Sequence, residues 1–186
     1  MPASVDLTGL RRQIERLGKT QKAAEQAVKR ARGTLSRRIV VEARRDIQTE
    51  YTLPANRITA GLFTRNNGDA VELTGVARGV GLINYKSTGG TKRKPLMVQV
   101  RTGDAPTQYD NTYFRATGLN GNRQLFERLP EKRRMVAGNY KGRLRNVIRS
   151  TYGPSVAQQL RRPGRADRLA GVAQKILAAE IERLVR

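Results

Sequence analysis

The sequence predicts an α+β protein with N-terminal helices, a small and mostly antiparallel β-sheet, and an amphipathic C-terminal helix. Three observations favour this class. Apolar residues recur every three or four positions through residues 1–50, short strand-like runs alternate with turns over 51–130, and the three-four spacing returns near the C-terminus. We expect a single domain made of an N-terminal helical arm (1–50), a β-rich core (51–130) and a basic segment followed by the C-terminal helix (131–186).

The N-terminal third has one narrow apolar stripe, which predicts helix. Gly18 followed by Thr20 is typical of a helix end and a new N-cap, so we expect a short helix to about Leu17 and a long one from Thr20 to about Glu50. The stripe consists of Leu7, Leu10, Ile14, Leu17, Ala24, Val28, Ala31 and Leu35, followed by Ile39, Val40, Ala43 and Ile47. It either packs against its own domain or contacts a neighbouring subunit.

The middle of the chain is expected to form short strands joined by turns. Pro54 suits the first turn of a short helix. The expected strands are 58–64, 70–77, 80–85, 96–101, 112–117 and 124–129, with tight turns at 66–69 and 118–122. The Gly-rich loop 86–94 and the polar loop 102–106 are expected to be exposed, mobile and available for partner contacts.

The stretch STYGPSVAQQL (150–160) separates the most basic run of the chain from the C-terminal helix, which is expected from about Ala166 to the end. Gly153 gives conformational freedom and Pro154 fixes φ, so together they are expected to turn the chain and stop a preceding basic helix. We treat residues Tyr152, Gly153, Pro154, Ser155 and Val156 as a candidate subunit-interface turn. Under this hypothesis Tyr152, Val156 and Leu160 dock onto the domain or a neighbour; the alternative is a plain linker between helices.

Composition excludes several kinds of chemistry. The chain has no Cys and no His, so disulfides, thiolate nucleophiles, Cys/His zinc sites and imidazole catalysis are ruled out. Lys and Arg number 37 against 15 acidic residues, giving a formal charge of +22 that favours polyanions or acidic protein surfaces as partners. We find neither a signal-peptide pattern nor an apolar run that could span a bilayer, and expect a soluble protein made in a cytoplasm.

No motif predicts an active site, and we expect no catalytic residue, no cofactor and no metal. Gly89-Gly90-Thr91-Lys92 lacks the spacing of a phosphate-binding loop and is better explained as a hairpin tip. Glu42, Asp46 and Glu50 share a helical face, where ion pairs with Arg38 and Arg45 on the same helix are the simpler interpretation. Asp104 and Asp110 flank a loop without a third ligand, and a metal-dependent nuclease built on them remains the third functional class.

The densest basic run favours contact with a polyanion. It consists of Arg128, Lys132, Arg133, Arg134, Lys141, Arg143, Arg145 and Arg149, opposed by Glu131. Because Tyr140 is the only aromatic residue inside it, base stacking is not indicated, and any DNA contact would be made through phosphates without sequence choice. The candidate polyanion-facing residues are Arg133, Arg134, Lys141, Arg143, Arg145 and Arg149.

Several segments together resemble a known family. In order, they are the basic helix leading into ARRDIQTEYTLPANRI, then VELTGVARGVGLINY, then FRATGLNGNRQLFERL, and the turn STYGPSVAQQL before a terminal helix. Over roughly residues 20–186 this order is similar to the minor tail protein Z family of lambda-like tailed bacteriophages, also called tail completion proteins. The most specific pieces are 152–156 and the strand 114–117 with its Asn/Gly-rich turn and Phe126. Ala157, where family members often have Pro, and the loop 86–94 depart from the pattern.

The resemblance implies a virion structural protein that has no catalytic role. Such a protein acts late in tail assembly at the head-proximal end of the tail, so that the tail can join a DNA-filled head. The implied partners are other tail and neck proteins (tail terminator, tail tube, tape measure and connector), a homo-oligomeric ring, and non-specific contact with genomic DNA, without a membrane. The implied location is the virion, with assembly in the host cytoplasm. The alternative is a non-specific nucleic-acid-binding protein.

Overall fold

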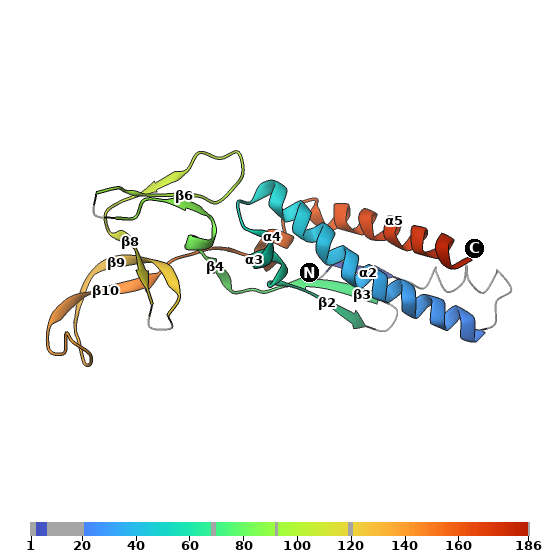
Figure 1. Cartoon of the computed structure of the whole chain (residues 1–186), viewed down its shortest axis with the longest axis horizontal. Helices are drawn as coiled ribbons and strands as arrows, with labels where there is room; N and C mark the ends of the chain where they lie inside the picture. The colour runs from blue at the N-terminus through green and yellow to red at the C-terminus, as the bar shows by residue number, and fades with distance from the viewer. Residues whose placement is uncertain (1–2, 7–20, 68–69, 92, 119–120, 186) are drawn as a thin grey trace. The chain divides into compact units, whose positions relative to one another are not determined.

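The fold class is confirmed as α+β in the computed structural model, which describes residues 3–6, 21–67, 70–91, 93–118 and 121–185. The chain forms two compact units, each assembled from separated segments (Figure 1). The first unit consists of Met1–Thr49, Ala55–Arg78 and Ser155–Arg186, and the second of Glu50–Pro54 and Gly79–Pro154. None of the helices within the described ranges is long and apolar enough to cross a membrane.

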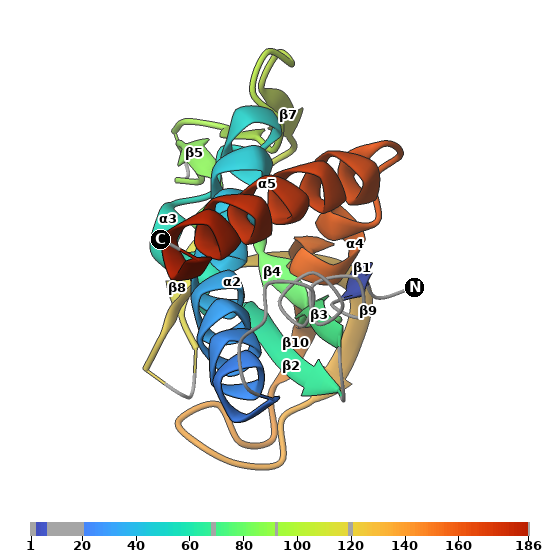
Figure 2. The same ribbon diagram turned by 90° about the vertical axis from the view of Figure 1, so that its right-hand side faces the viewer.

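Two long helices dominate the first unit. They are α2 (Gln21–Glu50) and α5 (Arg165–Val185), which lie side by side in both views (Figures 1 and 2). Thr34, early in α2, bonds to Glu180, late in α5, whereas Asp46 near the end of α2 bonds to Arg165 at the start of α5. The two helices are therefore antiparallel.

The apolar stripe of α2 faces the interior of its own unit. Val28, Ala31, Leu35, Ile39, Ala43 and Ile47 are all buried. On α5 the buried apolar residues are Leu169, Ala173 and Leu177, which also recur every four residues. For this part of the stripe, packing within the chain is the correct interpretation. The expected first helix, with Leu7, Leu10, Ile14 and Leu17, lies outside the described residues.

A small sheet completes the first unit. Its strands are β1 (Ala3–Asp6), β2 (Leu62–Asn67) and β3 (Ala70–Gly75), in the antiparallel order β1-β3-β2. Two short helices accompany it, α3 (Ala55–Thr59) and α4 (Val156–Leu160). The start of α4 lies so close to Gly75 that a Cβ added there would come within 2.8 Å of the backbone nitrogen of Ala157.

The second unit is made of short antiparallel strands. They are β4 (Gly79–Gly81), β5 (Lys86–Thr88), β6 (Leu96–Gln99), β7 (Thr107–Tyr109), β8 (Tyr113–Thr117), β9 (Arg123–Arg134), β10 (Leu144–Ser150) and β11 (Tyr152–Ser155), with the 3-10 turn η1 (Leu82–Asn84). They form the sheets β5-β6-β7, β10-β9-β8 and β11-β4. The buried apolar side chains of the unit are Tyr51, Leu53, Leu82, Tyr85, Leu96, Val98, Leu125 and Phe126.

The predicted elements agree with the structure where the apolar pattern is long. The long helix, the short helix after Pro54, the strands β3, β6, β8 and the first half of β9, and the C-terminal helix are all confirmed. Two shorter runs were only partly right. Residues 58–59 close α3 instead of opening a strand, because Ile58 is buried from a helical turn, and 82–84 form η1. The strands β1, β5, β7 and β11 were not expected: residues 86–88 were assigned to a loop and residues 152–155 to a turn.

Two further expectations are wrong. The basic run before the turn is not a helix, because residues 144–150 pair antiparallel with β9 and so complete a hairpin. The loop 86–94 is not wholly exposed: Gly90 is buried, and the guanidinium of Arg115 donates to the carbonyl of Gly89 (2.9 Å) and to the hydroxyl of Ser87 (3.0 Å). These bonds anchor the base of the loop to β8.

Candidate interaction surface

The candidate site is the hairpin of β9 and β10, residues 123–150, which we call the basic hairpin. Its inner half is fixed in the core by Leu125 and Phe126, both buried. The rings of Phe126 and Phe114, which are register partners on β9 and β8, stack with centroids 5.9 Å apart. From Pro130 to Asn146 every residue is exposed, so the outer half adds little to the core. This outer half projects as a ribbon closed by a loop (Figure 1).

The outer half concentrates positive charge. The basic hairpin has nine cations, Arg123, Arg128, Lys132, Arg133, Arg134, Lys141, Arg143, Arg145 and Arg149, against two acids, Glu127 and Glu131. All six candidate polyanion-facing residues lie here and are exposed. Arg133 and Arg145 are direct register partners across the hairpin, and like charges in this position destabilise strand pairing. A bound anion would reduce this repulsion. The structure thus brings the predicted residues together on one hairpin instead of one helix.

Both acids of the basic hairpin are already engaged. Glu127 accepts from Arg149 at 2.5 Å, and Glu131 lies 3.7 Å from Arg133. The hydrogen bond from Arg149 to Glu127, together with the attraction between their charges, raises the pKa of Arg149. Two other cations rest on aromatic rings: the guanidinium of Arg128 lies 4.3 Å from the ring centre of Phe114, and that of Arg145 lies 3.9 Å from Tyr140. Most of the positive charge therefore remains available to a partner.

Apolar side chains accompany this charge. The exposed ones are Met135, Val136, Leu144 and Ile148, together with the ring of Tyr140. A groove of about 550 Å³ is lined by five apolar residues and three arginines, together with Asn146: Phe114, Met135, Leu144, Val147 and Ile148, and Arg128, Arg133 and Arg145. Arg, Met and aromatic side chains are enriched where proteins bind one another. The surface therefore combines the two features of a docking site, an apolar floor and a charged rim.

The loop at the hairpin tip has a defined backbone. Met135 donates to the carbonyl of Arg143 (3.0 Å), and Gly142 donates to that of Met135 (2.8 Å). Gly138 and Gly142 have φ of 75° and 82°, a region that an L-residue with a side chain rarely adopts. Arg134 also donates to the carbonyl of Gly142 (2.9 Å). These contacts hold the tip in a defined conformation.

The candidate interface turn is largely used inside the chain. Ser155 is the N-cap of α4 and forms a capping box with Gln158, while Val156 is buried. A Cβ at Gly153 would lie 2.7 Å from the ring of Tyr85, whose hydroxyl donates to the carbonyl of Pro154 (2.8 Å). Val156 packs inside its own unit, as the docking hypothesis allows. The side chain of Tyr152 is 49% exposed, and a subunit interface at this residue stays a prediction.

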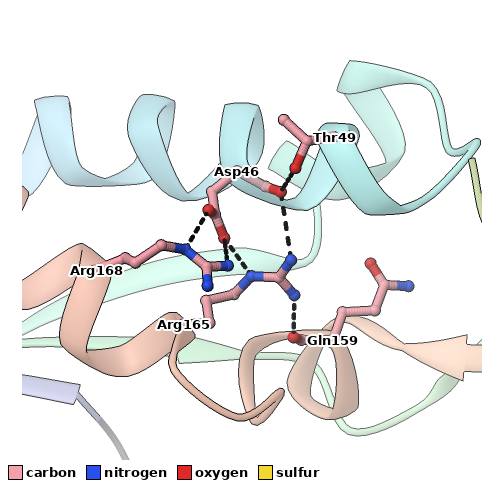
Figure 3. Close-up of polar contacts among 5 residues, drawn as sticks. All are labelled: Asp46, Thr49, Gln159, Arg165 and Arg168. Atoms are coloured by element: carbon pink, nitrogen blue, oxygen red, sulfur yellow. Dashed lines mark hydrogen bonds and ion pairs between the residues drawn. The ribbon is translucent and has the colours of Figure 1, made fainter.

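The acidic residues of α2 engage cations. Glu42 bonds to Arg45 at 2.7 Å, which confirms that ion pair. Asp46 instead bonds across to α5, to Arg165 and Arg168 (Figure 3). The side chain of Arg165 is fully buried and also donates to the backbone carbonyls of Gln159 and Asp46. Burial opposes ionisation of Asp46, but the bonds from Arg168 and Arg165 outweigh it and lower its pKa.

The acids of the loop have local roles. Asp110 accepts hydrogen bonds from the hydroxyl and the backbone N–H of Thr112, which lower its pKa. Asp104 contributes its backbone carbonyl to the side chain of Gln99 (2.8 Å). Within the ranges that the structure describes, no three His, Cys, Asp or Glu residues gather in a way that could hold a metal ion.

Comparison of the chain with protein-family models, with curated proteins and with solved structures finds no match.

Proposed function

We propose that this chain is a structural protein of a tailed-phage virion that completes the tail at its head-proximal end and is needed for head–tail joining. The basic hairpin carries the proposal: it is a preorganised, exposed surface with a strong excess of positive charge and an apolar floor. Such a surface suits an assembly protein, whose work is to bind neighbours.

The residues behind the family resemblance support the same role. Phe114 and Phe126 stack across β8 and β9 and so fix the base of the basic hairpin. The segment 152–156 runs from β11 into the capped start of α4. The most specific resembling segments are therefore those that hold the hairpin and connect the two units. We include a homo-oligomeric ring in this proposal because a phage tail is symmetric about its axis.

The test is electron microscopy of lysates from a phage that carries an early stop codon in this gene. We expect filled heads beside separate tails of normal length, with joining restored by the wild-type protein supplied in trans. Fully joined, infectious particles would reject the proposal. Supplying in trans a protein with Arg133, Arg143 and Arg145 changed to Ala should restore joining poorly, whereas the matched changes at exposed Arg57, Arg65 and Arg93 should restore it fully.

The second candidate function is non-specific nucleic-acid binding, favoured by the formal charge of +22. Its discriminator is the salt dependence of duplex binding, because each phosphate that is neutralised releases counterions. A protein that works on DNA should bind duplex tightly at low salt and weaken steeply as salt rises. The hairpin variants should then lose duplex affinity while the stop-codon phage still joins its tails.

A further inference from the structure

The outer edge of the basic hairpin is open to another strand. In the sheet order β10-β9-β8, β10 has β9 on one side and no further strand on the other within the described residues. Thr151 donates to the carbonyl of Leu125 (3.1 Å) and Met135 to that of Arg143 (3.0 Å). With the observed register, these bonds turn the backbone N–H and C=O groups of Leu144 and Ile148 away from β9. The edge therefore offers hydrogen bonds to a partner strand.

The side chains along this edge specify what such a strand would carry. Leu144 and Ile148, 62% and 54% exposed, are four residues apart on one strand and so share a face. The intervening Arg145 and the following Arg149 lie on the other face, beside Arg133 and Glu127 respectively. Next to an added strand, β10 would place Leu144 and Ile148 on one face and Arg145 and Arg149 on the other. The register partners of Leu144 and Ile148 on β9 are Arg134 and Arg128, so cations also border the apolar face.

We propose that the free edge of β10 binds an extended acidic segment of another virion protein by β-strand addition, with acidic and apolar side chains alternating along that segment. The proposal deepens the assembly role given above and rests on it for the class of partner. Main-chain hydrogen bonds would give affinity, the groove beside Leu144 and Ile148 would take the apolar side chains, and the arginines would take the acids.

Charge and exposure argue against the other occupants. A second copy of the basic hairpin would bring nine cations and two acids to the same edge, and the cations would repel. Duplex DNA would contact the arginines through its phosphates but would leave the apolar side chains of Leu144, Ile148 and Met135 without apolar contacts. An acidic segment with alternating apolar side chains satisfies both sets of groups.

Peptide binding tests the sequence pattern. The full-length protein is titrated by fluorescence anisotropy with a peptide of about eight residues, a common strand length, in which Glu alternates with Ile. The control peptide has Ser in place of Ile at equal charge. We expect the Glu/Ile peptide to bind at least about tenfold more tightly. Leu144→Ser with Ile148→Ser should remove this difference, whereas Phe63→Ser, at an exposed apolar position on β2, should leave it.

A single proline substitution tests whether the partner pairs with β10 as a strand. Ile148→Pro removes an N–H that faces away from β9, so the hairpin should survive, because proline is tolerated where an edge N–H points outward. We expect Ile148→Pro to lower the affinity for the Glu/Ile peptide by at least about tenfold, whereas Ile148→Val should bind the peptide as tightly as the wild type does. Should Ile148→Pro unfold, peptides N-methylated on alternate residues replace it: methylation along one edge should abolish binding and along the other should not.

Three results would overturn the proposal: equal binding of the two peptides, equal binding by the Pro and Val variants, or equal effects of the two methylation patterns. Duplex DNA binding that depends on Leu144 and Ile148 would also overturn it, in favour of DNA as the occupant. If the peptide does not bind but the stop-codon phage still leaves its tails unjoined, only the proposed docking mode is rejected. The assembly role would stand.

Discussion

At the scale of single residues, Arg165 is the most demanding side chain in the first unit. It is a fully buried cation in the first turn of α5, where the positive end of the helix dipole disfavours it. Asp46 and the carbonyl of Gln159, in the last turn of α4, compensate for both costs. The cluster thereby ties α2, α4 and the start of α5 together (Figure 3).

Removing one partner of this buried pair should be costly. We expect Asp46→Ala to lower the free energy of unfolding by about 3–5 kcal/mol, because it removes the carboxylate that compensates the buried charge of Arg165. Urea unfolding followed by circular dichroism measures this. The control is Glu42→Ala on the same helix, which breaks the exposed pair with Arg45 and should cost no more than about 1 kcal/mol. Equal losses in the two variants would contradict the assigned role of the cluster.

The same carboxylate predicts a pH dependence. The pKa of Asp46 is lowered in the folded state from its ordinary 3.8, so its ionised form stabilises the fold above that value and the contribution is lost as pH falls through the lower, folded pKa. We compare the free energy of unfolding of the wild type with that of Asp46→Asn. The advantage of the wild type should be constant between pH 7 and about pH 5 and should shrink below the ordinary pKa. A constant difference at all pH values would show that the charge of Asp46 has no part in it.

At the scale of helices, two glycines have room for a larger side chain. A Cβ at Gly33 in α2 or at Gly171 in α5 would meet nothing within 4 Å. Since glycine weakens a helix interior, we expect Gly33→Ala and Gly171→Ala each to raise the free energy of unfolding by about 0.5–1 kcal/mol. Gly75→Ala is the opposite case, because its Cβ would come within 2.8 Å of backbone at Ala157, and it should destabilise. Thermal unfolding of the three variants checks the signs.

How far the sequence predicts these elements depends on how long each pattern runs. The stripe from Val28 to Ile47 repeats over many turns, so both α2 and its buried face were predictable. Short runs contain too few residues to separate period two from period 3.6, which is why residues 58–59 and 82–84 were misjudged. The basic run was assigned to a helix because charge masks periodicity; its pairing with β9 is a long-range contact that local spacing does not encode.

The buried ion cluster shows what could have been read from the sequence. Arg165 and Arg168 occupy the first turn of a helix, where the positive end of the dipole disfavours cations. Asp167 is the one acid in that turn, so an acid from another element is a candidate partner for the second cation. Asp46 lies between Ala43 and Ile47, beside the buried stripe, and is the natural partner. The open edge of β10 had no such sequence signal, because strand order is a property of the folded sheet.

At the scale of the whole molecule, net charge is the dominant property. A formal charge of +22 on 186 residues means that folding gathers cations against their mutual repulsion. Local pairs such as Arg183 with Glu180 (2.5 Å) relieve it in places, but the basic hairpin has too few acids for this. Stability should therefore depend on which cations are removed and on how strongly salt screens the rest.

We expect the melting temperature to rise with NaCl, because salt screens repulsion between exposed charges. Changing exposed Lys132, Lys141 and Arg143 to Gln should raise it at low salt by about 2–4 °C and flatten the salt dependence. The matched control changes Arg45, Arg149 and Arg183, each in an ion pair, to Gln. It removes the same charge but also removes attraction, so it should not stabilise. If the melting temperature rose equally in both triple variants, total charge alone would set the stability. The basic hairpin would then be an ordinary solvated surface, and its charges would not be a concentrated source of repulsion.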